Sequence, residues 1–174
     1  GIKTIKDIQD IIAAGAEKVI INSYAFENPD FIKEASDAFG SSTIVVCIDV
    51  KKKFLKGEKT WVNNGSKSTK YDPVEFAKLM EKNGVGEIII QSIERDGKME
   101  GYDIELIKKI SEAVTIPVVA LGGAGDVSHL KQAFKNGYAN GLAAGSMFVY
   151  HGANKGVLIN YPKKSELTFD EVDS

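Results

Sequence analysis

The alternation of short apolar segments with amphipathic stretches is the feature that most narrows what this chain can fold into. The apolar segments are rich in Val and Ile and nearly free of polar positions, which is typical of parallel strands covered on both faces. Between them, apolar residues recur at helical spacing, and several of these stretches stop at a glycine. Alternating strands and helices predict βαβ units and a parallel sheet, an α/β fold. The expected strands are residues 18–22, 43–50, 87–93, 117–121 and 141–148, and the expected helices are residues 5–14, 29–39, 73–83, 104–114 and 127–136.

An internal repeat makes the prediction more specific. A shift of 122 residues aligns the first 26 residues with a later segment without a gap, so that Gly1 falls on Gly123 and Phe26 on Phe148. One period holds four βα units of about 30 residues, and eight such units would need about 240, close to the ~250 of a (β/α)8 barrel. We therefore expect a single domain over residues 1–174 that forms the C-terminal part, about five strands, of a (β/α)8 TIM barrel. The same arithmetic leaves roughly 70–80 residues of a barrel in front of Gly1. A small complete α/β sheet is the alternative.

Two segments interrupt the alternation. Residues 51–70 carry seven lysines and contain Asn64-Gly65, which predicts an inserted β-hairpin that turns at this pair. A solvated surface loop is the alternative for this segment. Residues 152–174 are expected to form a C-terminal tail.

Composition excludes several classes of function. The net charge of -2 argues against a nucleic-acid-binding surface, and the single cysteine, Cys47, excludes a disulfide framework and a zinc cluster. The two histidines, 22 residues apart, are too sparse for a histidine-based metal site. No metal or organic cofactor is expected. Without a long apolar run or a secretory signal, no membrane contact and a cytoplasmic location are expected.

Polar and glycine-rich residues follow the expected strands, where a barrel of this kind has its working face. Glycine loops let backbone N–H groups approach an anion closely, and a following helix N-terminus adds a favourable dipole. The two halves of the repeat therefore predict two phosphate sites and a long bisphosphorylated ligand, although plain turn glycines would give the same pattern. The candidate ligand residues are Gly1, Asn22, Ser23, Asp96, Gly97, Gly122, Gly123, Gly145 and Ser146.

Asp49 is the candidate catalytic residue. It follows five apolar residues at the end of an expected strand, so its carboxylate would point into the barrel mouth and could act as general acid or base. Alternatively, Asp49 caps the next element or pairs with Lys51. Asp96 is placed similarly, but an Asp-Gly pair is more often part of a turn. Cys47 is expected in the core, and His129 on an exposed helix face.

Four stretches together resemble a known family, the cyclase subunit of imidazole glycerol phosphate synthase. They read GAEKVIIN (15–22), FENPDFIKEASDAFGSSTIVVCIDVK (26–51), GEIIIQSIERDGKMEGYD (86–103) and IPVVALGGAG (116–125). The resemblance implies a two-fold-repeated barrel that receives ammonia from a glutaminase subunit docked on the strand N-terminal face, as a heterodimer. It also implies a lyase reaction of histidine biosynthesis, in which a bisphosphorylated ribulosyl nucleotide is cyclised and cleaved.

The resemblance also assigns residues. Asp49 matches one of two catalytic aspartates, and the glycine loops and Asn22-Ser23 match phosphate and ligand contacts. Lys18 and Glu87 lie near the N-terminal ends of their strands, where the family has its charged ammonia gate. A purely structural ion pair is the alternative for these two residues.

Three departures from the family pattern leave the function open. The second aspartate lies on the family's first strand, outside this chain, so the chain as given is not expected to complete the reaction. Gln91 and Leu121 stand where the synthase usually has threonine and serine. Residues 151–162, HGANKGVLINYP, resemble a paralogous branch associated with surface-polysaccharide gene sets, thought to supply ammonia to a separate enzyme that makes acetamidino sugars. The hypotheses are therefore a cyclase–lyase, an ammonia-supplying paralogue, or an inactive half-barrel that self-associates through its open sheet edges.

Overall fold

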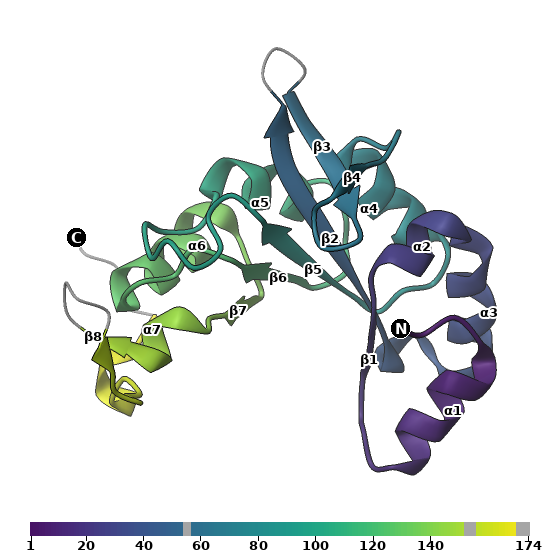
Figure 1. Ribbon diagram of the computed structural model, residues 1–174, viewed down its shortest axis with the longest axis horizontal. Helices are drawn as coiled ribbons and strands as arrows, with labels where there is room; N and C mark the ends of the chain where they lie inside the picture. Colours follow the sequence, from purple (N-terminus) through teal and green to yellow (C-terminus); the bar gives the residue numbers. More distant parts are fainter. Residues whose placement is uncertain (54–56, 152–155, 170–174) are drawn as a thin grey trace.

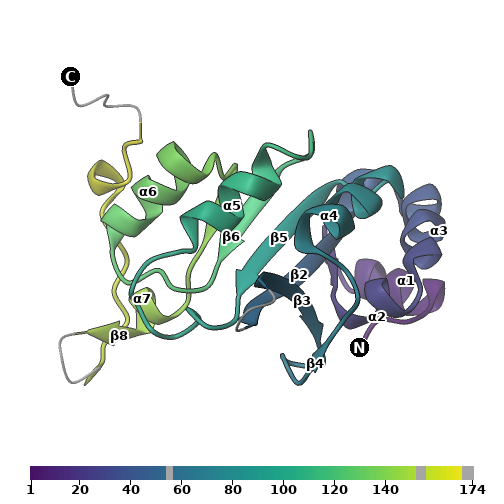
Figure 2. The same ribbon diagram turned by 90° about the horizontal axis from the view of Figure 1, so that it is seen from above.

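The computed structural model describes residues 1–53, 57–151 and 156–169. A curved parallel sheet runs through the centre, and most helices lie along its outer side (Figure 1, Figure 2). The strand order is β1-β2-β5-β6-β7, and every pair in this series is parallel. Each of these strands is connected to the next by at least one helix. These five strands are β1 (Val19–Ile21), β2 (Ile44–Lys53), β5 (Glu87–Ser92), β6 (Val118–Leu121) and β7 (Gly141–Ala143).

The predicted α/β fold, a partial TIM barrel with five parallel strands, is confirmed. The predicted helices are also present, and each ends within three residues of its expected position. The helices are α1 (Ile5–Ala13), α2 (Ser23–Glu27), α3 (Pro29–Phe39), α4 (Pro73–Lys82), α5 (Ile104–Ser111), α6 (Val127–Gly137) and α7 (Ser146–Val149), with 3-10 turns η1 (Ser41–Thr43) and η2 (Lys164–Glu166).

One strand prediction is wrong. The last strand was expected to reach Phe148, but β7 ends at Ala143 and residues 146–149 form the short helix α7. Gly145 adopts φ -118 and ψ -65, outside the extended region, so the backbone turns there and continues as a helix. Helix α2, which follows directly after β1, was not predicted.

Polar side chains fix where the helices begin. Asp72 accepts a hydrogen bond from the Val74 N–H at 2.9 Å, and Pro73 occupies the first position of α4, where a proline N–H is not needed. Asp103 and Asp126 accept from backbone N–H groups in the first turns of α5 and α6 in the same way. An oxygen acceptor at each site satisfies a donor that the helix leaves free.

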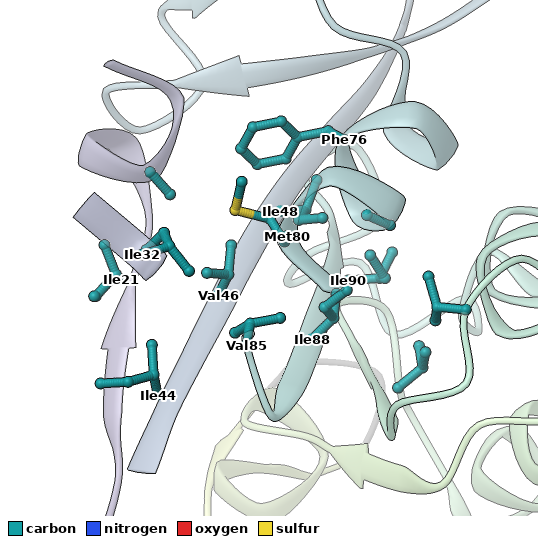
Figure 3. Close-up of a cluster of buried hydrophobic side chains, with 14 of the residues drawn as sticks. Ile21, Ile32, Ile44, Val46, Ile48, Phe76, Met80, Val85, Ile88 and Ile90 are labelled. Carbon is teal, nitrogen blue, oxygen red and sulfur yellow. The ribbon is translucent and has the colours of Figure 1, made fainter. Parts of the chain in front are cut away.

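The main core lies between the sheet and its helices. Side chains of β2 and β5 point outward and meet those of α3 and α4, and each of them is at most 1% exposed (Figure 3). Because successive strand residues point to opposite faces, the intervening residues of β2 and β5 face the inner side of the sheet. The strand and helix residues at the centre of this core are Val46, Ile48, Ile88, Ile90, Ile32, Phe76 and Met80.

The segment expected as an inserted hairpin continues the end of β2. Strand β2 runs three residues beyond the expected end and pairs antiparallel with β3 (Gly57–Val62), which pairs with β4 (Lys67–Ser68). Asn63, Asn64 and Gly65 lie between β3 and β4, with φ of 54, 55 and 73. Residues 54–56, between β2 and β3, lie outside the described residues.

The expected tail is described over residues 156–169. Strand β9 (Gly156–Val157) pairs antiparallel with β8 (Tyr150–His151), and the chain then crosses to α6, where the Phe169 ring lies 5.3 Å from that of Phe134. Residues 152–155 and 170–174 of the expected tail lie outside the described residues.

Candidate functional site

The side chains on the inner face of the sheet form three layers, because the strand register places residues of neighbouring strands beside one another. At the carboxyl ends of the strands, Asp49 lies beside Gln91, Gln91 beside Leu121, and Leu121 beside Ala143. Two residues earlier, the layer contains Cys47, Ile89 and Val119. The layer nearest the amino ends contains Ile20, Val45 and Glu87. Polar groups are thus concentrated at the two ends of the sheet, with an apolar layer between them.

Asp49 is buried at the carboxyl end of β2, with 7% of its surface exposed. Burial raises the pKa of Asp49, and the negative charge of Asp96 adds to the rise, whereas hydrogen bonds from Asn22 and Cys47 lower the pKa. A raised pKa brings a carboxyl group closer to the range in which it can both donate and accept a proton, which suits a general acid or base. Lys51, the alternative partner, instead holds its Nζ 5.2 Å from the ring centroid of Trp61.

A chain of polar contacts joins Asp49 to Asp96 across two strands. The Cys47 Sγ lies 3.7 Å from Asp49 Oδ1 and 4.0 Å from Gln91 Oε1. The Gln91 Nε2 donates to Asp96 Oδ2 at 3.2 Å. Cys47 lies in the interior as expected, yet its side chain shares the inner face with Asp49, because the two residues are two positions apart on one strand.

The glycine loops after β6 and β7 meet at one small cavity of about 10 Å³. Six of the predicted ligand residues line this cavity together with Leu121, so the fold brings residues from three separate loops together. The six are Asp96, Gly97, Gly122, Gly123, Gly145 and Ser146.

The remaining predicted ligand residues lie elsewhere. The Asn22 Nδ2 donates to the Cys47 carbonyl oxygen at 3.0 Å, on the neighbouring strand. The Ser23 Oγ donates to Asn22 Oδ1 and accepts from the Asn63 N–H, at 3.0 and 3.1 Å. The Gly1 position, where an added Cβ would meet no atom within 4 Å, is open.

Lys18 and Glu87 form an ion pair at the amino-terminal edge of the sheet. The Lys18 Nζ lies 2.6 Å from Glu87 Oε2, although 69 residues separate the two in sequence. They meet because β1 and β5 both flank β2. This pair is at the opposite end of the inner face from Asp49.

The sequence did not indicate that the side chain of His129 contacts the loop before α6. It was expected on an exposed helix face, but its side chain is only 19% exposed, and its Nδ1 accepts a hydrogen bond from the Gly125 N–H at 3.1 Å. An added Cβ on Gly101 would lie 3.2 Å from the His129 ring, so this ring also supports the loop after β5. The spacing of four residues between Gly125 and His129, across the start of a helix, is the only sequence signal for this contact.

The described part of the chain contains no cluster of three or more His, Cys, Asp or Glu side chains placed to hold a metal ion. None of its described helices combines the length and the apolar character needed to cross a membrane.

Comparison with known proteins identifies the family. A family model described as histidine biosynthesis protein matches residues 1–155. The chain belongs to the histidine biosynthesis protein family. The matched residues include all five parallel strands and all the residues of the three inner-face layers.

Several relatives in this family carry the name of one subunit. The imidazole glycerol phosphate synthase subunit HisF of Clostridium botulinum strain Langeland is 44% identical over 165 residues, which are 94% of this chain and 65% of that protein. A protein of Leptospira interrogans that carries the same name provisionally is 42% identical over 167 residues, 95% of this chain and 66% of its own. A provisionally named hisF2 subunit of Pseudomonas aeruginosa is 41% identical, with 96% and 66% coverage. The chain thus spans just under two thirds of the length of these relatives.

Proposed function

We propose that this chain forms the larger part of an ammonia-using HisF-type cyclase subunit, with Asp49 as a catalytic acid or base. The observation that carries this proposal is the buried Asp49 carboxyl at the carboxyl end of the inner face, with its raised pKa. Family membership and the names of the relatives support the reaction class. In the proposed reaction, ammonia nitrogen enters a bisphosphorylated ribulosyl nucleotide, a new imidazole ring closes to give imidazole glycerol phosphate, and an aminoimidazole carboxamide ribotide is released, as in histidine biosynthesis.

The inner face suits the passage of ammonia from one end to the other. Lys18 and Glu87 mark the end at which we expect a glutaminase subunit to dock and ammonia to enter. The layer between this pair and Asp49 is apolar apart from the thiol of Cys47, and Ile89 and Val119 contribute to it. Ammonium would lose its hydration there without a compensating partner, whereas neutral ammonia would cross at much lower cost.

Asp49 would act on the nucleotide at the end of this path. With its proton, the carboxyl group can protonate a leaving or accepting atom, and without it the carboxylate can remove a proton from the nitrogen that attacks. The second carboxylate that the family uses lies outside this chain, so Asp49 covers one of the two proton-transfer roles.

Turnover of the full-length protein encoded by the source gene, with its glutaminase, tests this proposal. Substitution Asp49→Asn should abolish turnover with both glutamine and ammonium salts, because the chemical step itself is lost. Substitution Glu87→Gln should impair turnover with glutamine but spare turnover with added ammonium, because only delivery is affected. Glu34 is an exposed residue of α3, so Glu34→Gln is the matched control. It should change turnover neither with glutamine nor with ammonium salts. Full activity of the Asp49→Asn protein would refute the assigned role.

A second candidate function is ammonia supply to another enzyme, which makes acetamidino sugars for surface polysaccharide. Gln91 and Leu121 favour it, because they replace two small hydroxyl residues in the layer that holds Asp49. In this case the full-length protein would bind its glutaminase and activate it without turning over the nucleotide, and Asp49→Asn would leave that activation unchanged. An inactive half-barrel would instead show concentration-dependent self-association in analytical ultracentrifugation, with no glutaminase activation.

A further inference from the structure

His129, on α6, contacts the loops that follow β5 and β6. Its Nδ1 accepts a hydrogen bond from the Gly125 N–H at 3.1 Å, at the end of the loop after β6. Its ring packs against the loop after β5, because a Cβ added to Gly101 would lie 3.2 Å from the His129 Cδ2. The Gly101 N–H donates to the Gly123 carbonyl oxygen at 2.7 Å. One side chain of α6 therefore contacts two loops that are also hydrogen-bonded to each other.

The loop after β6 needs such contacts because of its composition. Residues 122–125 contain three glycines, and glycine has more conformational freedom than any other residue. Gly122, Gly123 and Ala124 line the cavity at the carboxyl ends of the strands. Contacts from outside the loop are required to hold its backbone N–H groups in one direction. The hydrogen bond from Gly125 to His129 is such a contact, placed directly before α6 begins.

The internal repeat contains the same contact in its other half. The shift of 122 residues that aligns the two halves places Asp7 on His129 and Lys3 on Gly125. Asp7 Oδ2 accepts a hydrogen bond from the Lys3 N–H at 2.9 Å. In both halves the acceptor is the side chain of the third helical residue, and the donor is the backbone N–H four residues earlier. The contact therefore belongs to the repeated unit and is not peculiar to one loop.

The two halves share the acceptor atom and not the charge. Asp7 accepts through a carboxylate oxygen, whereas His129 accepts through a ring nitrogen that carries no proton, which places the ring proton on Nε2. Asparagine also has an acceptor atom bonded to Cγ, so His129→Asn keeps an acceptor at this position. Leucine has only methyl groups there, so His129→Leu removes the acceptor and keeps a side chain of similar reach.

We propose that His129 is a positioning residue that holds the loop after β6 in the conformation that binds a phosphate group through backbone N–H groups. It acts through Gly125, and it lies outside the residues that line the cavity. This inference rests on the proposed function, because it takes a phosphorylated substrate as the ligand of the loop. It adds that the affinity for this ligand depends on one acceptor atom of α6.

Phosphate binding and turnover by the full-length protein encoded by the source gene test this proposal. The binding probe is inorganic phosphate, followed by the amide NMR signals of residues 122–125, with sodium chloride as the ionic-strength control. His129→Leu should weaken phosphate binding about fivefold to tenfold, because the loop is no longer held. With ammonium salts as the nitrogen source, it should raise KM for the nucleotide by a similar factor and leave kcat within about twofold.

The conservative variant separates positioning from a general effect on folding. His129→Asn should bind phosphate within about twofold of the unsubstituted protein, because it retains the acceptor. Gln132 is an exposed residue of the same helix, so Gln132→Leu is the matched control and should change neither phosphate affinity nor KM. The ring 15N signals of His129 in the unsubstituted protein should show the proton on Nε2.

Four outcomes would overturn the inference. They are absence of phosphate binding at residues 122–125 of the unsubstituted protein, unchanged phosphate affinity in His129→Leu, an Asn variant that binds no better than the Leu variant, and a His129 ring proton on Nδ1. The last outcome decides even if His129→Leu does not fold. Loss of turnover in Asp49→Asn together with unchanged phosphate affinity in His129→Leu would support the proposed function and refute this inference. Phosphate affinity that depends on His129 without any nucleotide turnover would do the reverse.

Discussion

The reactivity of Cys47 offers a direct measurement of the environment of Asp49. Cys47 is the single cysteine of the chain, so a thiol reagent reports on one position. Burial, together with the negative charge of Asp49, raises the pKa of the Cys47 thiol from 9.0 to about 12. Only the thiolate attacks such reagents. At pH 9, about 0.1% of a thiol with this pKa is ionised, against about half of an ordinary one, so the reaction should be about 500-fold slower than that of a free cysteine.

The assay follows the release of the coloured thiol from Ellman's reagent at pH 9, in the native chain and in the same chain unfolded in urea. Substitution Asp49→Asn should accelerate the native reaction, because the charge that disfavours the thiolate is removed. The unfolded proteins should react alike, since both thiols are then solvated. A native rate within about tenfold of the unfolded rate would refute the described burial of Cys47. An Asp49→Asn rate equal to that of the unsubstituted protein would refute the electrostatic contact.

Three further predictions concern stability, measured by urea unfolding. Burial raises the pKa of Asp49 in the folded state, so the protonated carboxyl group stabilises the fold at low pH, and this contribution is lost as pH rises through the folded pKa. The Asp49→Asn protein should therefore have a higher free energy of unfolding than the unsubstituted protein at pH 7. The difference between the two free energies should become smaller as pH falls toward the ordinary Asp pKa of 3.8. Gly86→Ala should cost about 1–3 kcal/mol, because the added Cβ would lie 2.2 Å from the Ser41 carbonyl oxygen, whereas Gly1→Ala meets nothing within 4 Å and should cost almost nothing. Asp72→Ala should cost about 1 kcal/mol through loss of the N-cap of α4; an unchanged unfolding midpoint would contradict that role.

Local sequence signals predicted most of the fold. The Val- and Ile-rich segments and the helical spacing between them are sufficient to order the strands and helices, because strands buried on both faces and amphipathic helices have different apolar periods. Asp72-Pro73 marks the start of α4 for an equally local reason, since the cap bonds reach only two or three residues along the chain. The failure at β7 is local too. Residues 141–148 are apolar enough for a strand, and their composition does not indicate that the backbone turns at Gly145.

The candidate site was predicted only in part. The sequence predicted that Asp49 ends an apolar strand and that the glycine loops follow strands, and the structure has them there; their roles stay predictions. The link from Asp49 through Cys47 and Gln91 was not foreseen, because it depends on the register of β2 against β5. The contact of His129 with Gly125 was missed for a related reason: helical spacing alone assigned this side chain to solvent.

The sequence by itself determined the α/β class, the limits of most elements and the type of residue at the end of each strand, since these properties depend on neighbours along the chain. Only the tertiary structure decided which distant residues meet, such as Lys18 with Glu87 across 69 positions. It also decided how much room the glycine loops leave. Cavity volume is the small difference between closely packed side chains and backbone from several elements, and a motif of glycines does not encode that difference.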